Sequence, residues 1–522
     1  MIDNPLRRRH ATHLRWRPPP WDEHHPEWLQ LDRALPADHR ARLIERLVDQ
    51  LDCQPWLHDF CAGFGAAAYP PQLFLKIMLY EFDQQALSPA HWRRHCQESL
   101  PLRWLTRGAC PSRAVLYDAR RRLSPAMLLQ LNQQLLQQVR TPAGLPWRAS
   151  LDGTFVAAKG SRHQLLNLQR LDKRLGQLQQ AADAAAHGSI GRRPSWMAST
   201  ADGRSRQQQR YQKARERLAG KLQRHQRQQS RRAKTKRRSA ERVVICVSEP
   251  EAAIGKDKLK VVRPLYNVQL VRALDGPWLL GYGVFAAVSD AGLLPPMLER
   301  LRTLTGTVPH DLLADGIYAS VLDLKVCQEQ QVRLYAPVGA AAPRLPLPIV
   351  PAASGGVDPP SPTPARPAKG YYGKEQFAWD ETTQTYVCPA GERLQRIARG
   401  HETRGEGRSV GVDKYGTKAC ATCTQRSRCT RSPRGRLLKR LVDEPLLEEL
   451  RQRMQTAAGK ELYRQRKATI ELAFADLKEH RGLRRLCGYG VDQAEAVIGL
   501  LVLLHNGKAL LKQRQAAATA TA

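Results

Sequence analysis

Acidic residues are scarce in this chain. Its 522 residues include 48 Asp and Glu against 83 Lys and Arg, which gives a formal charge of +35 and a pI near 10.3. An excess of this size is costly in self-repulsion unless a polyanion offsets it, and it attracts phosphate backbones. We therefore expect a nucleic-acid partner. Charge alone leaves open a basic housekeeping protein, such as a ribosome-associated factor.

The sequence also lacks a long apolar run. The start, Met1 to Trp21, contains arginines but no apolar core of signal-peptide length. The longest apolar stretch, residues 496–504, is too short to cross a bilayer and is interrupted by Gly499. We expect a cytoplasmic protein with no membrane contact. Of the 11 cysteines, those outside one cluster are expected to be reduced thiols.

Residues 1–140 are expected to form a helical, DNA-binding domain. Tyr69-Pro-Pro opens a segment whose apolar residues are spaced to make one buried helix face. Two further helical pieces, 88–97 and 111–123, flank a turn region with Gly108. This pattern favours a helix-turn-helix that places arginines on phosphates or base edges: Arg113, Arg120 and Arg121. An ordinary helical bundle with a solvated basic face is the alternative.

Residues 148–337 indicate an α/β region. Apolar strand patterns alternate with a helix at 291–303, which implies a mixed sheet flanked by helices. An insertion at 162–242 carries leucines at 3,4 spacing and predicts a helical hairpin. Its second half is so basic that only Glu216 and Glu241 oppose the cations from 204 to 242. It is either a solvated face or a phosphate-tracking arm, and we favour the arm, with contacts from Arg231, Arg232, Arg237 and Arg238.

The remainder divides by composition. Residues 338–369 are rich in Pro and Ala and predict a flexible linker. A Cys-containing module follows at 370–435, then C-terminal helices at 440–512, and a tail at 513–522 that is expected to be disordered.

Four cysteines cluster in the 370–435 module. A Cys420-x-x-Cys423 pair is joined by Cys388 and Cys429, which fits a tetrahedral zinc site. We expect the module to lack an apolar core of its own, so that structural Zn²⁺ would hold its fold, as in a zinc ribbon. A reduced Cys-x-x-Cys turn and a relic site that has lost its metal are the alternatives.

Three carboxylates stand out as candidate metal ligands. Asp152 lies within an apolar strand and Asp315 follows another, where an unpaired acid is costly to bury. An Asp before Gly also forms turns, so each has a structural alternative. Glu471 shares a helix face with Lys467 and Lys478, which suits a ligand between phosphate clamps but also a surface charge ladder. Asp476 and Glu479 are rival carboxylates on the same segment.

The ordered set of motifs resembles the Asp-Asp-Glu transposases of bacterial insertion sequences. Leu151-Asp-Gly-Thr-Phe-Val resembles the first catalytic block, Leu313-Ala-Asp-Gly-Ile-Tyr the second, and Arg466-Lys-Ala-Thr-Ile-Glu the third. The segment beginning Tyr69-Pro-Pro-Gln resembles the family's N-terminal domain. The family more usually has Asp-Ala-Gly-Tyr in the second block, so Gly316 stands one place early. Tyr463 with Arg464, Arg466 or Lys467 only approximates the family's Tyr/Arg/Glu/Lys signature.

The resemblance implies an RNase H-like core that cleaves DNA at the ends of an insertion sequence and joins the 3′-hydroxyl to target DNA. Asp152, Asp315 and Glu471 would bind two Mg²⁺ ions, for which Mn²⁺ can substitute. Lys478, with Arg466 or Lys467, would hold the DNA end. Terminal inverted repeats and target DNA are the expected partners, in a homodimer or larger synaptic assembly associated with the bacterial nucleoid. A catalytically inactive DNA-binding repressor and an RNA nuclease are the alternatives.

Overall fold

The protein forms two compact units. The computed structural model describes residues 14–61, 66–139, 147–187, 193–230, 232–257, 259–339, 371–404 and 408–521. Unit 1 comprises Met1–Asp290, Pro296–Pro309 and Arg466–Ala522, and unit 2 comprises Ala291–Pro295 and His310–Gln465. Arg231 and nearly all of the expected linker lie outside the described residues.

Unit 1 begins with the expected helices. Pro71 opens the apolar helix α4, and Ser112 and Ser124 cap α7 and α8 by accepting from backbone N–H groups of the first turn. The stretch between α5 and α7, expected as a turn, itself contains the short helix α6. The helices are α1 (Pro26–Ala34), α2 (Arg40–Asp49), α3 (Leu57–Phe60), α4 (Pro71–Asp83), α5 (Trp92–Glu98), α6 (Leu100–Leu105), α7 (Arg113–Arg122) and α8 (Pro125–Gln137).

An antiparallel sheet follows in unit 1. Its strands are β1 (Arg148–Ala157), β4 (Ala253–Lys256), β5 (Val262–Ala273) and β6 (Leu279–Phe285), and β5 pairs with each of the others. In the β1–β5 register Asp152 lies opposite Leu270 and Thr154 opposite Val268. Directly opposed residues share a face, so these four point to the same side of the sheet. The helix α11 (Leu294–Thr305) follows, and its buried residues Met297, Leu298, Leu301 and Leu304 belong to unit 1.

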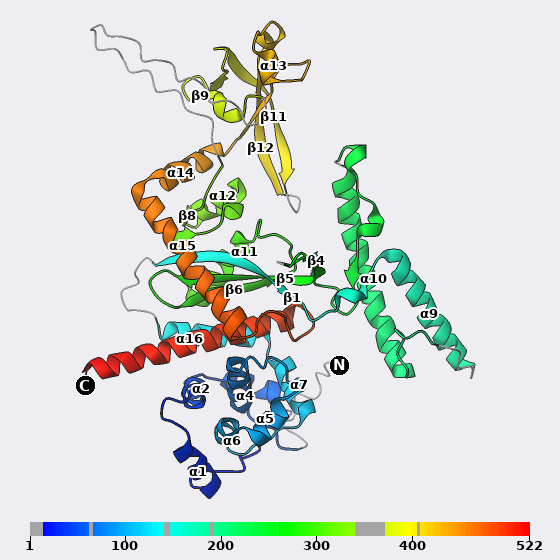
Figure 1. Cartoon of the computed structure of the whole chain (residues 1–522), viewed down its shortest axis with the longest axis vertical. Helices are drawn as coiled ribbons and strands as arrows, with labels where there is room; N and C mark the ends of the chain where they lie inside the picture. The colour runs from blue at the N-terminus through cyan, green and yellow to red at the C-terminus, as the bar shows by residue number, and fades with distance from the viewer. Residues whose placement is uncertain are drawn as a thin grey trace. The chain divides into compact units, whose positions relative to one another are not determined.

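The long helix α16 (Val491–Thr521) forms the centre of the unit 1 core. It packs against β6, α8 and α4, and Figure 1 shows it between the sheet and the N-terminal helices. By length and composition it could cross a membrane, but 78% of its apolar window is buried within the protein, as in a core helix. The expected disordered tail is instead a continuation of this helix as far as Thr521.

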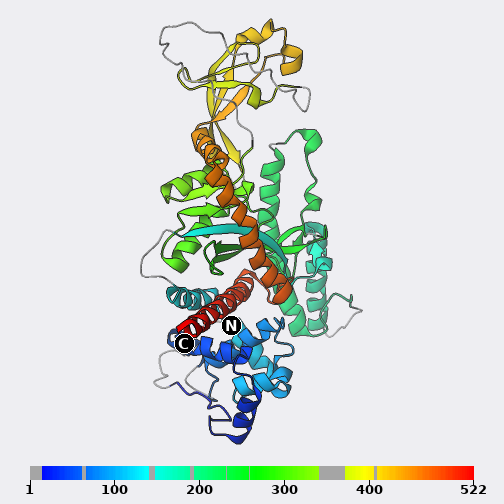
Figure 2. The ribbon, with the colours of Figure 1, turned by 60° about the vertical axis from the view of Figure 1, so that its left-hand side comes forward.

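The insertion is a helical hairpin, as predicted. α9 (Leu168–Ala186) and α10 (Ala201–Ser230) lie side by side in Figures 1 and 2. Leu171 and Leu178 pack on Tyr211 and Leu218, the seam that the 3,4 spacing indicates. The short strands β2 (Leu165–Leu166) and β3 (Ile245–Cys246) pair at its base.

Unit 2 combines parallel and antiparallel strands. β7 (Asp311–Leu313) and β8 (Arg333–Tyr335) are parallel and joined through α12 (Val321–Glu329). A separate antiparallel sheet has the order β13-β12-β11-β10-β9, with α13 (Arg426–Cys429) nearby. The bounds of its strands are β9 (Ala378–Asp380), β10 (Thr385–Val387), β11 (Arg393–Arg404), β12 (Arg408–Gly416) and β13 (Leu438–Leu441). α14 (Glu444–Gln455) and α15 (Ala457–Ala475) follow, and α15 passes into unit 1 at Arg466. The architecture is therefore mixed α/β with an N-terminal helical region.

The Cys-containing module has an apolar core, contrary to expectation. Phe377, Trp379 and Tyr386 are almost fully buried there, together with Tyr415 and Leu438. The rings of Trp379 and Tyr386 lie 4.8 Å apart between centroids. The sequence does not predict this core, because its aromatic residues lie singly on different segments and come into contact only when the strands pair. The module therefore has an apolar core of its own.

Candidate active site and DNA interface

Asp152 lies in the middle of β1, on the face that α15 covers. Its Oδ2 is 3.0 Å from the guanidinium of Arg466, and its Oδ1 accepts from the Gly153 N–H at 2.9 Å. The Asp152 side chain remains 23% exposed, whereas the neighbouring Ser150 and Leu151 are fully buried. A partly exposed carboxylate on a buried strand is placed where a ligand can reach it.

Glu471 is carried across this face by α15. The helix is tied to β1 by Arg466 before Glu471 and by Lys478 after it, since Lys478 donates to the Thr154 hydroxyl. Between these ties Arg272 on β5 donates to the carbonyl of Thr469 at 2.5 Å. Figures 1 and 2 both show this part of α15 crossing β1 and β5. Glu471 is therefore bracketed by contacts to the strand that bears Asp152.

The side chains of this helix divide as the sequence predicts. Ile470, Phe474 and Leu477 are buried and hold the helix in place. Glu471 and Lys467 are exposed. The carboxylate of Glu471 thus faces solvent beside a strand to which its helix is rigidly tied, an arrangement open to a metal ion or to DNA.

Asp315 is in unit 2, directly after the buried strand β7. Its side chain is exposed and caps the following turn, Gly316–Tyr318, by accepting from the Gly316 N–H. The turn-forming alternative is therefore realised, although the residue also stands at a strand end where ligands are common. A Cβ at Gly316 would lie 2.8 Å from the carbonyl oxygen of Pro337. This close approach explains why glycine stands directly after the aspartate in this chain.

Asp476, the rival carboxylate, is engaged by the protein itself. It lies in a π-helical turn, Asp476–His480, that continues α15. Its oxygens are 3.0 Å from Nδ1 of His505 and 3.5 Å from the guanidinium of Arg481. Burial would raise the pKa of Asp476, but the hydrogen bonds and charges of His505 and Arg481 outweigh burial and lower it to about 2. Asp476 is thus a structural acid.

A second structural acid, Asp83, was missed by reading the sequence. Three cations from distant segments surround its carboxylate: Arg481, Lys508 at 3.0 Å and Arg40 at 3.3 Å. Glu81 and Asp83 at the end of the apolar helix α4 were the available signal, because acids are rarely buried without partners. The partners themselves could not be inferred from their positions in the chain.

The candidate DNA-binding arginines differ in exposure. Arg113 and Arg121 are exposed on α7. Arg120 is buried and donates to the carbonyl of Cys487 at 3.2 Å, so its guanidinium supports the loop before α16. In the basic segment after α10, Arg232, Arg237 and Arg238 are exposed. The structure thus leaves Arg113, Arg121 and these three arginines accessible to a polyanion.

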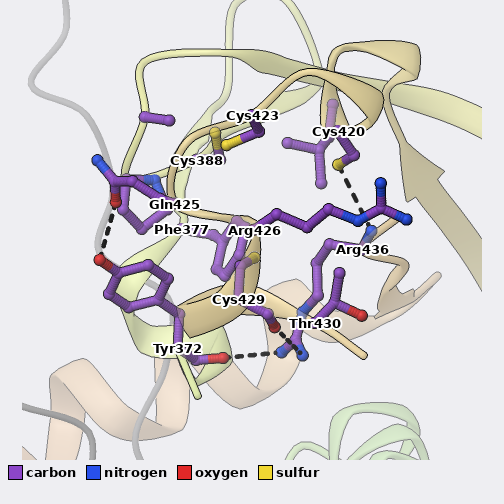
Figure 3. A pocket seen from close by; sticks show the side chains of 13 residues that line it. Tyr372, Phe377, Cys388, Cys420, Cys423, Gln425, Arg426, Cys429, Thr430 and Arg436 are labelled. Carbon is purple, nitrogen blue, oxygen red and sulfur yellow. Dashed lines mark hydrogen bonds between the residues drawn. The ribbon is translucent and has the colours of Figure 1, made fainter. Parts of the chain in front are cut away.

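The four clustered cysteines converge on one pocket in unit 2. Cys388, Cys420, Cys423 and Cys429 line it together with Tyr372 and Arg436, as Figure 3 shows. The Arg436 N–H points to Sγ of Cys420 at 3.5 Å. Burial raises the pKa of the Cys429 thiol, Arg436 opposes this shift, and the other three cysteines add to it. Even so, within the described ranges no three His, Cys, Asp or Glu side chains are arranged to hold a metal ion.

Two families match the chain. Residues 387–511 match the family described as Transposase DDE domain, and residues 29–122 match the family described as Transposase domain (DUF772). The chain thus contains a transposase DDE domain and, before it, an N-terminal transposase domain. No curated protein matches this transposase.

The matched segments cover only part of the candidate site. In this transposase the Transposase DDE domain match begins at Val387, immediately before Cys388, and includes all four clustered cysteines and Glu471. The N-terminal match includes α7 with Arg113 and Arg121. Asp152 and Asp315 lie between the two matches. Their assignment as ligands therefore stays a prediction, supported by their placement at partly exposed positions next to buried strands.

Proposed function

We propose that this transposase cleaves and joins DNA with Asp152, Asp315 and Glu471 as the ligands of two Mg²⁺ ions, in an RNase H-like core. The observation that carries the proposal is the attachment of α15 to β1 on both sides of Glu471. It holds the segment that bears the exposed Glu471 against the strand that bears the partly exposed Asp152. Carboxylate oxygens from separate elements are the ligands that Mg²⁺ prefers.

The roles of the chain's own residues follow from this geometry. Bound Mg²⁺ would supply an activated water and neutralise charge on the scissile phosphate and the leaving oxygen. Arg466 forms an ion pair with Asp152. The Arg466 guanidinium would therefore lie beside a DNA phosphate that is bound close to the Asp152 carboxylate. Lys478, fixed by Thr154, places a second cation on the other side of Glu471. With Lys467 exposed on the same helix, these cations would hold the DNA end.

DNA binding away from the site would use the exposed arginines. Arg113 and Arg121 on α7 and the segment with Arg232, Arg237 and Arg238 present cations that the protein leaves accessible. Terminal inverted repeats and target DNA are the proposed partners. Because two ends must be brought together, we propose that a homodimer or larger assembly acts at the bacterial nucleoid.

We test the catalytic proposal by nicking of a supercoiled plasmid that carries the ends of the element, with Mg²⁺ or with EDTA. Wild-type protein should nick only with Mg²⁺, and Glu471→Gln should bind the ends without nicking. Glu479→Gln is the matched control, since Glu479 is an exposed acid in the adjoining turn. Binding without nicking by the wild type would instead identify a repressor. Preferential cleavage of a competing RNA would identify an RNA nuclease.

The basic segment after α10 calls for a separate test. Replacing Arg232, Arg237 and Arg238 by Gln should weaken binding to all DNA sequences alike. Each lost phosphate contact reduces the slope of log affinity against log salt by about 0.9. An unchanged salt slope would show that this segment does not contact DNA. Substituting the exposed acids Glu216 and Glu241 provides a control for general effects on the hairpin.

We also propose that the four-cysteine pocket binds structural Zn²⁺. Although no three of these side chains are arranged around an ion among the described residues, four thiols line one pocket and a backbone N–H is directed at Cys420, a contact that favours a thiolate. Purified protein should contain about one zinc per chain, and Cys423→Ser should lose it. Because the module has its own aromatic core, the variant should retain a folded module. Wild-type protein without zinc, purified with zinc present, would refute the proposal.

A further inference from the structure

One exposed aromatic side chain in unit 1 has no role in the proposed cleavage chemistry. Tyr489 belongs to the loop between the π-helical turn and α16, where Leu483 and Leu486 are buried, yet its own side chain is 53% exposed. Nζ of Lys159, which follows the end of β1, lies 4.6 Å from the centre of the Tyr489 ring. The ring therefore presents an open aromatic surface beside a cation.

The loop that carries Tyr489 is held rigidly against β1. The N–H of Leu486 donates to the carbonyl of Ala157 at 2.8 Å. The guanidinium of Arg485 donates to the carbonyl of Lys159 at 2.7 Å. The loop and the end of β1 thus form one surface, and the position of Tyr489 relative to Lys159 is fixed by contacts on both chain segments.

A buried carboxylate completes this attachment. Glu249 is only 1% exposed and accepts from three donors: the N–H groups of Gly490 at 2.6 Å and Gly160 at 3.2 Å, and the Tyr266 hydroxyl at 3.1 Å. Gly160 adjoins Lys159 and Gly490 adjoins Tyr489. Burying an acid is costly unless its hydrogen bonds are met. The hydrogen bonds of Glu249 fix the backbone beside Tyr489 and Lys159. Less conformational entropy is therefore lost when a ligand binds to these two side chains.

The surroundings of Tyr489 are basic and aromatic rather than apolar. The guanidinium of Arg113 lies 5.7 Å from the ring centre of Tyr117, and the charges of Arg113 and Lys159 both act on the Tyr117 hydroxyl. Arg485 is exposed in the same loop and its guanidinium contacts the carbonyl of Lys159. We call Tyr489, Lys159, Arg485, Tyr117 and Arg113 the Tyr489 surface. Cations interleaved with exposed rings suit single-stranded nucleic acid, in which bases stack on rings and phosphates meet cations.

We propose that Tyr489 stacks on an unpaired nucleobase of DNA while Lys159 and Arg485 contact the neighbouring phosphates. The inference rests on the proposed function, because it takes DNA as the ligand. It adds a feature that the metal site does not require, namely the binding of a DNA strand that is not paired in a duplex. The exposed part of the ring would stack on the base. Stacking on one aromatic side chain changes affinity about 5- to 150-fold.

The test compares binding of full-length protein to two DNA probes in EDTA, which prevents cleavage. One probe is a plain duplex and the other is the same duplex with a single-stranded extension that contains 2-aminopurine. Wild-type protein should prefer the extended probe and should quench the 2-aminopurine fluorescence. Tyr489→Ala and Tyr489→Leu should lose both the preference and the quenching, with affinity for the extended probe reduced about 5- to 150-fold. Tyr489→Phe should retain both.

The outcomes separate this inference from the proposed function. If Tyr489→Ala binds and quenches the extended probe as the wild type does, the stacking role is refuted. If Tyr489→Leu also retains both properties, the ring is not what the extension contacts. If the wild type binds neither probe, the DNA function itself fails. Because Tyr489 is exposed, the variants should unfold at the wild-type denaturant concentration, and that measurement accompanies each binding curve.

Discussion

Two clusters of acids and bases lie along the same helical segment of unit 1, and they differ in how completely the protein satisfies them. The open cluster comprises Asp152, Arg466, Glu471 and Lys478. The closed cluster comprises Asp83, Arg481 and Asp476 with their partners. The Asp152 side chain is 23% exposed and pairs with Arg466, whereas the Asp83 side chain is 2% exposed and is surrounded by three cations.

The exposure of a carboxylate and the number of its cationic partners therefore distinguish structural from functional acids in this molecule. An acid whose oxygens are taken up by buried cations contributes to folding and has little room for another ligand. An acid left partly exposed, on an element tied down at both sides, can bind a metal ion without unfolding anything.

Asp152→Asn should reduce Mg²⁺-dependent nicking by on the order of 10³-fold or more, because a neutral amide is a poor ligand for Mg²⁺ and does not offset its charge. Binding to DNA should change little. The measurement is the initial rate of plasmid nicking at saturating protein. Nicking at the wild-type rate would remove Asp152 from the open cluster's proposed role.

Asp83→Ala should lower the free energy of unfolding by about 3–5 kcal/mol, because it removes the carboxylate that the buried Arg481 guanidinium and Lys508 share. Denaturant unfolding followed by circular dichroism measures the change. Asp152→Asn is the comparison in the same assay and should alter stability much less. Equal losses from the two substitutions would break the distinction between the clusters.

The stability that Asp476 contributes should depend on pH. Its pKa in the folded protein is lowered to about 2, so its contribution is present above the ordinary value of 3.8 and is lost as pH falls through the folded value. Asp476→Asn should therefore cost about 2 kcal/mol at neutral pH and less as the pH approaches 3. Urea unfolding of both proteins at several pH values measures this. A cost independent of pH would contradict the ionic role.

Glu479→Gln should have the smallest effect, at most about 0.5 kcal/mol in stability, and should leave nicking unchanged. Its ion pair with Arg484 joins side chains that are 53% and 71% exposed, where solvent screens the attraction. Thermal unfolding of the variant and of the wild type measures this change in stability. A loss comparable with that of Asp83→Ala would mean that exposure does not separate the clusters.

Local patterns predicted the elements of this fold well. The spacing of apolar residues identified α4, the α9–α10 hairpin and the buried stripe Ile470, Phe474 and Leu477. This spacing can be recognised because residues on one helix face lie only three or four positions apart in the sequence. The strand at Asp152 was likewise found, because most residues from Leu151 to Ala157 are apolar.

Contacts between distant segments could not be read in the same way. Asp83 meets Arg481 and Lys508 only after three distant segments have packed, and the burial of Arg120 depends on a loop near residue 487. The aromatic core of the Cys-containing module was missed for the same reason. The glycine after Asp315 was seen as a departure, but its cause, the nearby carbonyl of Pro337, needed coordinates.

Whether Asp152, Asp315 and Glu471 bind the same metal ions can be tested most directly by iron-dependent cleavage of the polypeptide. Mg²⁺ is replaced by Fe²⁺ in the complex with DNA ends, and ascorbate and peroxide are added, so that the polypeptide is cut only next to the bound ion. We expect cuts near all three carboxylates, and excess Mg²⁺ should suppress them. Cuts near only two of these residues, with the third segment intact, would contradict the proposal that the three carboxylates bind the same pair of ions.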